Sequence, residues 1–182
     1  MRRGPMMLLW TIQHRAAYLQ LLENGIMRAD EHHLFCEDDF LHAYKWIAGQ
    51  MSERIGQPPK DVHYPVWAWY QWEGIRKRPD MRSHRRWTKK GEPIVLLTID
   101  VPDKDVLLSD FGMWHCVLSN VYLPLSEEDD VDHTEAEKVS SWNRIFQIDT
   151  QTHYWDTPKS TQATFWELRQ EWVLKAERFI SA

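Results

Sequence analysis

Basic side chains are concentrated in one stretch of the sequence, between Ile75 and Lys90. Only Asp80 opposes them there, and Trp72 and Trp87 stand near the two ends. Arginine side chains beside aromatic planes can bind phosphate groups and stack on bases, so this segment is a candidate surface for an anionic partner. A solvated loop over residues 74–92 that carries charge for solubility is the alternative. The basic residues of the stretch are Arg76, Lys77, Arg78, Arg82, Arg85, Arg86, Lys89 and Lys90.

Two other clusters could hold a metal ion, and their spacing argues against it. Residues 30–42 contain every ligand type that zinc favours. A helical zinc site needs two histidines one turn apart, however, and His32 and His33 point to different sides of any regular structure. The acidic run at 127–132 has no regular spacing of ligands, so we expect a solvated acidic loop over 126–134 and no metal site.

Nucleophilic catalysis and phosphate-cradling loops find no support in the sequence motifs. There is no GxSxG elbow and no glycine-rich phosphate loop, which disfavours an α/β-hydrolase, a kinase or a Rossmann dehydrogenase. His115 directly precedes Cys116, an order that does not by itself pair a base with a nucleophile.

Length and composition indicate one domain over residues 1–182, with residues 1–6 disordered. The chain has 182 residues, 43% of them hydrophobic, and a net charge of -5, so it lacks the overall basic field of a protein that coats DNA. Two cysteines without a CxxC pair exclude a disulfide scaffold and zinc ribbons. No apolar run has the length of a membrane span, so we expect a cytoplasmic protein with no membrane partner. Eleven tryptophans are spread along the chain, and composition alone does not say whether they pack or bind.

Hydrophobic periodicity predicts the elements of the first half of the chain. A strand over 7–12 precedes a helix over 13–24, for which Gly25 is a natural C-cap. Apolar residues at steps of three and four predict a second helix, capped by Asp38 or Asp39 and ending at Gly56.

The second half of the chain contains two predicted strands and an ambiguous tail. Residues 64–72 suit a strand that Pro65 restricts to a strand start or a sheet edge, and 94–101 is a β-branched run typical of a central strand. Residues 110–122 are ambiguous. Thr134 and Glu137 form a capping box that predicts a short helix. The tail over 161–180 fits either one helix or two strands, QATFWEL and LKAERFI, around a turn.

Three segments give the chain a family resemblance: LWTIQ at 9–13, LLSDFGMWH at 107–115 and QATFWEL at 162–168. Through them it resembles a bacterial domain-of-unknown-function family, number 3841 (DUF3841), which implies no known activity. More distantly, the opening strand with Thr11, the helix that ends in LENGI at 22–26, and the strands at 93–100 and 106–110 resemble ADP-ribosyltransferase-like domains of the DarT type, which modify DNA.

The distant resemblance implies an α+β fold of split β-sheets with flanking helices. It also implies NAD as substrate, no metal, and transfer of ADP-ribose to a nucleic acid or protein. In such enzymes a Glu on a late strand, often in a Gln-x-Glu setting, holds the nicotinamide ribose and stabilises the oxocarbenium-like transition state. Gln162 and Glu167 are the candidates here. The family glutamate aligns closer to Thr164, and on a regular strand Gln162 and Glu167 face opposite sides unless a bulge intervenes.

The remaining site residues also follow from this resemblance. Thr11 and Gln13 would hold NAD, and Trp114 or Tyr70 would stack on nicotinamide or adenine. The full set of NAD-binding candidates is Trp10, Thr11, Gln13, Tyr70, Asp110, Trp114 and His115, and the acceptor would meet Arg82, Arg85 and Arg86.

Structural roles are the alternatives for most of these residues. Thr11 would cap the first helix, Glu167 would complete a capping box with Thr164 in a helical tail, and the tryptophans would fill the core. Two other functions also stay open. One is a non-catalytic module that binds nucleic acid or protein, and the other is a hydrolase or lyase acting on a small nucleotide.

Overall fold

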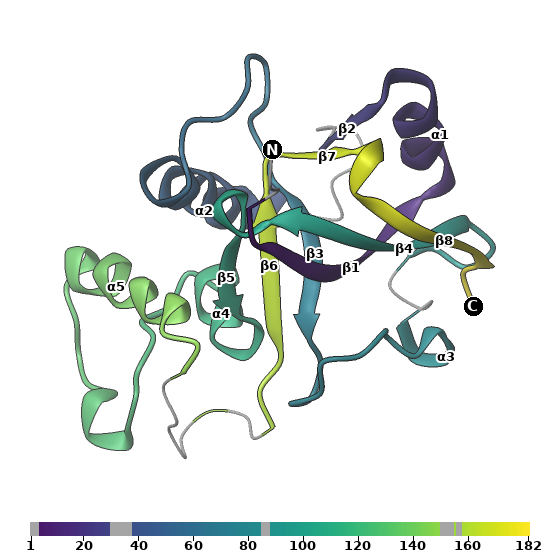
Figure 1. Ribbon diagram of the computed structural model, residues 1–182. Helices are drawn as coiled ribbons and strands as arrows, with labels where there is room; N and C mark the ends of the chain where they lie inside the picture. The colour runs from purple at the N-terminus through teal and green to yellow at the C-terminus, as the bar shows by residue number, and fades with distance from the viewer. Residues whose placement is uncertain (1–3, 30–37, 85–87, 150–154, 156–157) are drawn as a thin grey trace.

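An antiparallel sheet of six strands, in the order β5-β6-β3-β1-β4-β8, forms the centre of the computed structural model (Figure 1). Its strands are β1 (Met6–His14), β3 (Val66–Gln71), β4 (Pro93–Pro102), β5 (Leu107–Asp110), β6 (Thr161–Phe165) and β8 (Val173–Ile180). Two short strands, β2 (Ile26–Arg28) and β7 (Glu167–Arg169), pair separately. The structure describes residues 4–29, 38–84, 88–149, 155 and 158–182.

The sheet is nearly divided between β1 and β3. β1 pairs with β4 along all of its nine residues, whereas its register with β3 has a single pair, Trp10 with Trp69. The strands β5-β6-β3 and β1-β4-β8 therefore form two halves that diverge beyond that pair.

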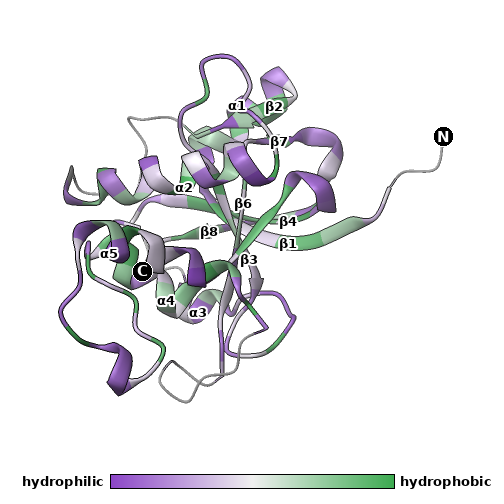
Figure 2. Cartoon of the chain, turned by 90° about the vertical axis from the view of Figure 1, so that its left-hand side faces the viewer, coloured by the Kyte–Doolittle hydropathy of each residue, from purple (hydrophilic) through white to green (hydrophobic). Residues whose placement is uncertain are grey.

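Helices cover the two faces of the sheet unequally. The helices are α1 (Arg15–Asn24), α2 (Leu41–Arg54), α3 (Met81–His84), α4 (Phe111–Leu118) and α5 (Glu135–Ser141). Side chains of α1, β2 and β7 pack on one face with Leu9, Leu97 and Phe165. On the other face, α2 and α4 pack with the 3-10 turn Trp142–Phe146 next to α5 (Figure 2). The described residues form a single mixed α+β domain, and none of their helices is long and apolar enough to cross a membrane.

The predicted N-terminal elements are confirmed with small shifts. β1 extends to His14, so α1 begins at Arg15 and ends at Gly25, whose left-handed φ of 72° lets its N–H bond to the Leu21 carbonyl. Met6 is the first residue of β1, and the Pro5 carbonyl accepts a hydrogen bond from the Asp103 amide.

Four other elements can be compared with their predictions. α2 follows a 3-10 turn at Asp38–Phe40, and its N-cap residue, Phe40, makes no side-chain cap. Pro65 immediately precedes β3, as a strand-start proline, although β3 lies inside the sheet. β4 is an inner strand, as predicted. The capping box of Thr134 and Glu137 begins α5, as predicted.

The structure also assigns the segments whose sequence was ambiguous or predicted a loop. Residues 110–122 contain α4. The tail is not a helix, but its strands do not form a hairpin either, because β6 pairs with β3 and β5, β7 with β2, and β8 with β4. The expected loops are partly regular: α3 lies in the basic segment, and a 3-10 turn at Glu127–Asp129 lies in the acidic one.

Candidate functional site

An aromatic cavity of about 250 Å³ lies where β1 and β3 diverge. The sheet contributes Trp10, Trp67 and Trp69, because alternate residues of a strand face the same side. Helices α2 and α4 cover these rings with Tyr44, Phe111 and Trp114.

The rings of the cavity pack edge to face or tilted. The centroids of Trp67 and Trp114 are 5.1 Å apart, and Tyr44 meets them at 5.7 and 6.2 Å. Trp69 meets Phe111 at 4.9 Å. Electron-rich ring faces held in this way form walls that suit a flat aromatic or cationic ring.

Three buried polar atoms among the cavity-lining residues have no hydrogen-bond partner in the described part of the chain. They are Nε1 of Trp67, Oγ1 of Thr88 and Nε2 of Gln162. Gln162 is only 4% exposed, and Ser109, its partner across β5 and β6, also has an unsatisfied buried hydroxyl. A buried donor without an acceptor costs roughly 1–3 kcal/mol. The cavity therefore holds hydrogen-bonding capacity that the described residues do not use.

The Thr11 side chain connects the diverging strands β1 and β3 by a hydrogen bond. Its hydroxyl donates to the Trp67 carbonyl at 2.6 Å and accepts a hydrogen bond from Nε2 of Gln13 at 2.7 Å. Its expected alternative role as a helix cap is wrong, because α1 begins four residues later with His14 at the N-cap position. Thr11 and Gln13 thus shape the cavity wall.

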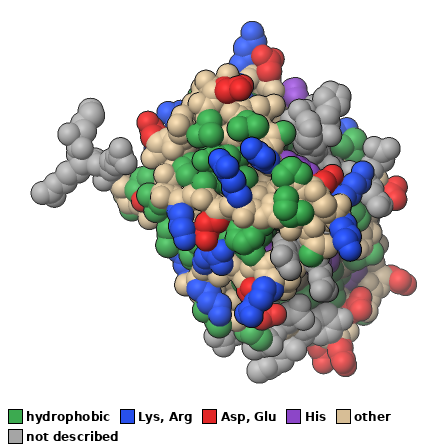
Figure 3. Space-filling view, turned by 90° about the vertical axis from the view of Figure 1, so that its right-hand side faces the viewer, with side chains coloured by type: hydrophobic (Ala, Val, Ile, Leu, Met, Phe, Trp, Pro, Cys, Tyr) green, Lys and Arg blue, Asp and Glu red, His purple; other side chains and the backbone are tan. Residues whose placement is uncertain are grey.

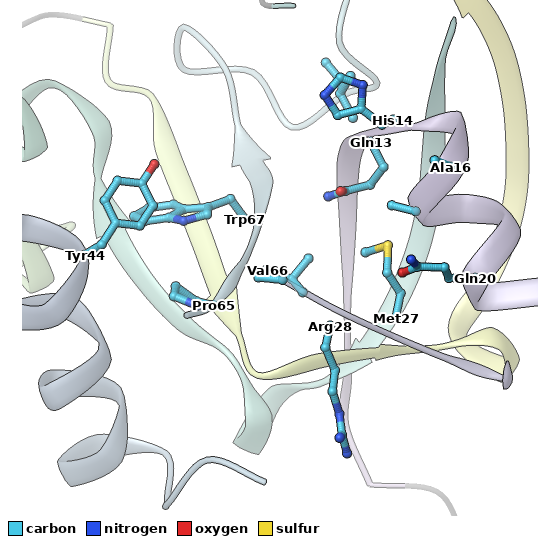
Figure 4. A pocket seen from close by; sticks show the side chains of 13 residues that line it. Gln13, His14, Ala16, Gln20, Met27, Arg28, Tyr44, Pro65, Val66 and Trp67 are labelled. Atoms are coloured by element: carbon cyan, nitrogen blue, oxygen red, sulfur yellow. The ribbon is translucent and has the colours of Figure 1, made fainter. Parts of the chain in front are cut away.

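A smaller cavity of about 110 Å³ adjoins the first and shares Ile12, Tyr44 and Trp67 with it. Figure 4 shows its polar side chains at the ends of β1 and β2 and on α1. Gln13, His14, Gln20 and Arg28 line it. The two cavities together follow the gap between the halves of the sheet.

Glu167 lies outside the lining of both cavities. On β7 its carboxylate is paired with Arg28 at 3.1 Å and with Arg169 at 3.1 Å, and its side chain is 12% exposed. Arg28 itself lines the smaller cavity. The structure therefore separates the two predicted catalytic residues: Gln162 lines the aromatic cavity, and Glu167 is in an ion-pair cluster on the other sheet.

The other predicted NAD contacts also divide into two groups. Trp10, Thr11 and Trp114 line the aromatic cavity with Gln162, and Gln13 lines the smaller one. Tyr70, Asp110 and His115 line neither of them.

Each of these three residues makes a contact elsewhere in the protein. Asp110 caps α4 through the Met113 amide and lies 3.4 Å from Nζ of Lys159. The exposed His115 contacts the Phe111 carbonyl, and the Arg76 guanidinium stacks on the Tyr70 ring at 3.7 Å.

Sequence reasoning missed four of the aromatic residues that line the aromatic cavity. Trp67 and Trp69 alternate in the strand VWAWY, which places them on one face, and this signal was available. Tyr44 and Phe111 line the cavity because α2 and α4 cover that face of the sheet. The sequence pattern does not show this packing.

The described arginines of the basic segment are engaged within the protein. Arg78 pairs with Glu177 at 2.8 Å, and Arg76 donates to the Leu8 carbonyl. Arg82 binds Asp80 and lowers the pKa of that carboxyl to about 2. The face that carries β8 and α1 shows Lys and Arg side chains among hydrophobic ones, with some Asp and Glu side chains between them (Figure 3). Arg85 and Arg86 lie outside the described residues.

Metal ligation and thiol chemistry gain no site in the described residues. Within them no group of three or more potential ligands could hold a metal ion, and most of the 30–42 cluster lies outside them. Burial, with a smaller effect from Asp130, raises the pKa of the Cys116 thiol to about 11, so it is protonated near neutral pH.

Fold and site together define an α+β domain whose nearly divided sheet encloses an aromatic cavity. The chain matches the sequence model of the family described as "Domain of unknown function (DUF3841)" over residues 8–139, and it belongs to this family. The matched range contains LWTIQ and LLSDFGMWH and ends before QATFWEL. Comparisons with curated proteins and with solved structures find no match.

Proposed function

We propose that this protein is an ADP-ribosyltransferase-like domain that binds NAD in the aromatic cavity and transfers ADP-ribose to a macromolecular acceptor. The observation that carries the proposal is the aromatic cavity at the gap between the two halves of the sheet. A split sheet is the architecture that the sequence resemblance implies. The cavity residues Trp10, Thr11 and Gln162 are among those that the resemblance assigns to the site.

The two adjoining cavities suit the two parts of a dinucleotide. An aromatic ring of NAD would stack among Trp67, Trp69 and Trp114. The phosphates would extend into the smaller cavity, where Arg28 and His14 supply basic groups.

In the proposed reaction the bond between nicotinamide and ribose breaks, and nicotinamide leaves with the bonding electrons. The acceptor forms a bond to the ribose carbon and loses a proton. Positive charge develops on the ribose, and a carboxylate would stabilise it. We assign this role to Glu167: phosphates bound by Arg28 would release one of its oxygens, while Arg169 keeps the other.

The acceptor would bind at the basic segment, and we place the reaction in the cytoplasm, where NAD is available. Of the predicted acceptor contacts, Arg82 is 88% exposed on its side chain, and Asp80 is its only side-chain partner within the described part of the chain. An anionic acceptor could replace that weak surface pair.

A second candidate function is a binding module that does not cleave NAD. It is favoured by the absence of any Asp or Glu among the described residues that line the aromatic cavity. In this case Glu167 only ties β7 to β2, and the cavity holds a nucleotide or a modified partner.

Label transfer from adenylate-radiolabelled NAD separates these functions. The purified protein would be mixed with cell extract, DNA or RNA, with Glu167→Gln alongside and the exposed Glu171→Gln as the matched control. The transferase predicts label on a macromolecule that is lost only in Glu167→Gln.

Three other outcomes would contradict the transferase. A rise in melting temperature with NAD but no labelled acceptor and no released nicotinamide would support the binding module. Nicotinamide release without labelled acceptor would indicate a hydrolase. If millimolar NAD does not change the melting temperature, NAD is not a ligand of this protein.

A further inference from the structure

The unsatisfied polar atoms of the aromatic cavity include two hydrogen-bond donors on the same face of the sheet. Trp67 pairs with Thr164 across β3 and β6, and Trp69 pairs with Gln162, so Trp67 and Gln162 lie one alternation apart on neighbouring strands. Both line the cavity, and both have a buried N–H group without an acceptor in the described residues.

We propose that the cavity selects its ring by hydrogen-bond acceptors on the ring's edge, with Trp67 and Gln162 as the two specificity-determining donors. The ligand class is a planar heteroaromatic ring that carries an oxo or carbonyl group. This inference rests on the proposed binding of an aromatic ring in the cavity.

The direction of selection follows from the chemistry of the two groups. An indole N–H can only donate, and the end of Gln162 that lacks a partner is its amide NH₂, which also only donates. Thr88 can donate or accept, so its hydroxyl does not discriminate. A ring that presents an amino group to these donors leaves them unpaired, whereas an oxo group satisfies them.

Burial makes this difference matter. Gln162 is 4% exposed and its side-chain nitrogen is buried, so bulk water does not supply the missing acceptor. A buried donor left unpaired reduces binding by roughly tenfold or more, since its desolvation is not repaid.

For NAD the inference assigns the two ends of the molecule. The carboxamide oxygen of nicotinamide has two lone pairs and can accept from Trp67 and Gln162 at once, whereas the exocyclic group of adenine is an amino donor and each of its ring nitrogens accepts only one hydrogen bond. The nicotinamide end therefore enters the aromatic cavity, and the adenylate end lies toward Arg28 and the smaller cavity.

Two purines of nearly the same shape test the inference: hypoxanthine has a 6-oxo acceptor beside an N1–H donor, and adenine has a 6-amino donor beside an N1 acceptor. Calorimetric titration should show that the wild-type protein binds hypoxanthine about tenfold more tightly than adenine. Gln162→Glu replaces a donor with an acceptor and should abolish or reverse the preference. Trp67→Phe keeps an aromatic wall but loses a donor, and it should reduce the preference. Gln50→Glu, the same chemical change on the surface of α2, should leave it unchanged.

The outcomes distinguish this inference from the function on which it rests. If neither purine nor nicotinamide binds, ring binding itself fails. If the rings bind but the wild type prefers adenine or binds both equally, the inference alone is wrong. It is also wrong if a folded Gln162→Glu protein, checked by its melting curve, keeps the preference for hypoxanthine.

Discussion

The indole N–H groups differ between the two sides of α4. On the side of α5, Trp142 donates to the Val121 carbonyl at 2.8 Å, and Trp155 donates to the Pro124 carbonyl at 2.6 Å. On the side of the sheet, Trp67 lines the cavity, and its buried indole N–H has no acceptor among the described residues. The same chemical group is thus satisfied in one region and unsatisfied in the other.

The satisfied region is a polar network centred on Asp129. Its carboxylate accepts from the Tyr122 hydroxyl at 2.9 Å and from the Leu125 amide at 3.0 Å, and it pairs with Arg144. The His133 ring stacks on Tyr122 at 3.3 Å. We call this region the Asp129 network. It satisfies its own polar groups, as a structural element does, whereas the cavity keeps donors for which a ligand is the natural acceptor.

The largest expected effect is on the Asp129 network. Asp129→Ala removes the acceptor of three groups at once, and it should lower the free energy of unfolding by about 3 kcal/mol, because hydrogen bonds to charged groups are the strong ones. Urea unfolding measures this loss. The exposed Asp132→Ala is the control and should change stability little, and an equal loss in both variants would contradict the assignment.

The second-largest effect on stability is expected for Thr11→Val, because this change removes the side-chain hydrogen bond between β1 and β3. The valine leaves the Trp67 carbonyl and the Gln13 amide without their partner, which should cost about 1.5 kcal/mol. Thr98→Val on β4 is the matched control, since the Thr98 hydroxyl makes no side-chain hydrogen bond in the described residues. Equal urea midpoints for the two variants would show that the Thr11 bonds contribute nothing.

Gln162→Met should raise the free energy of unfolding, whereas the two preceding variants should lower it. It replaces an unsatisfied buried amide by an apolar side chain of similar size, and the ligand-free protein should gain about 1 kcal/mol. The same variant should bind aromatic rings less tightly. A destabilised Gln162→Met protein would mean that the amide is already satisfied in the folded state.

The smallest effect is the pH dependence of the Asp129 network. The Leu125 amide, then Arg144 and Tyr122, hold the pKa of Asp129 below its ordinary value of 3.8. A depressed carboxyl pKa gives stability that is present above the unfolded value and is lost as the pH falls through the folded value.

The melting temperature of the wild type should therefore fall more between pH 7 and about pH 3 than that of Asp129→Asn. Asp132→Asn should follow the wild type. An Asp129→Asn protein with the same acid sensitivity as the wild type would place the effect on other carboxyl groups.

Local features of the fold could be predicted from the sequence, because they depend on neighbouring residues. Gly25 ends α1, and the pair Thr134 and Glu137 begins α5, through contacts within four residues. The tail could not be resolved in the same way. The partners of β6, β7 and β8 lie elsewhere in the chain, and local periodicity does not encode long-range pairing.

The candidate site could be predicted from the sequence only in part, for the same reason. Trp10, Thr11, Trp114 and Gln162 were named and line the aromatic cavity, but Trp67 became visible as a site residue only through the packing of α2 and α4. Glu167 was a candidate only through the family resemblance, and its ion pair with Arg28 depends on the pairing of β2 with β7.

The most direct test of the account is the indole N–H resonance of Trp67 in a ¹H–¹⁵N spectrum, assigned with Trp67→Phe, during titration with NAD. The account predicts that this resonance shifts downfield as the donor finds an acceptor, while those of Trp142 and Trp166, already bonded to backbone carbonyls, stay in place. A Trp67 resonance that does not move at millimolar NAD would contradict ligand binding in the aromatic cavity.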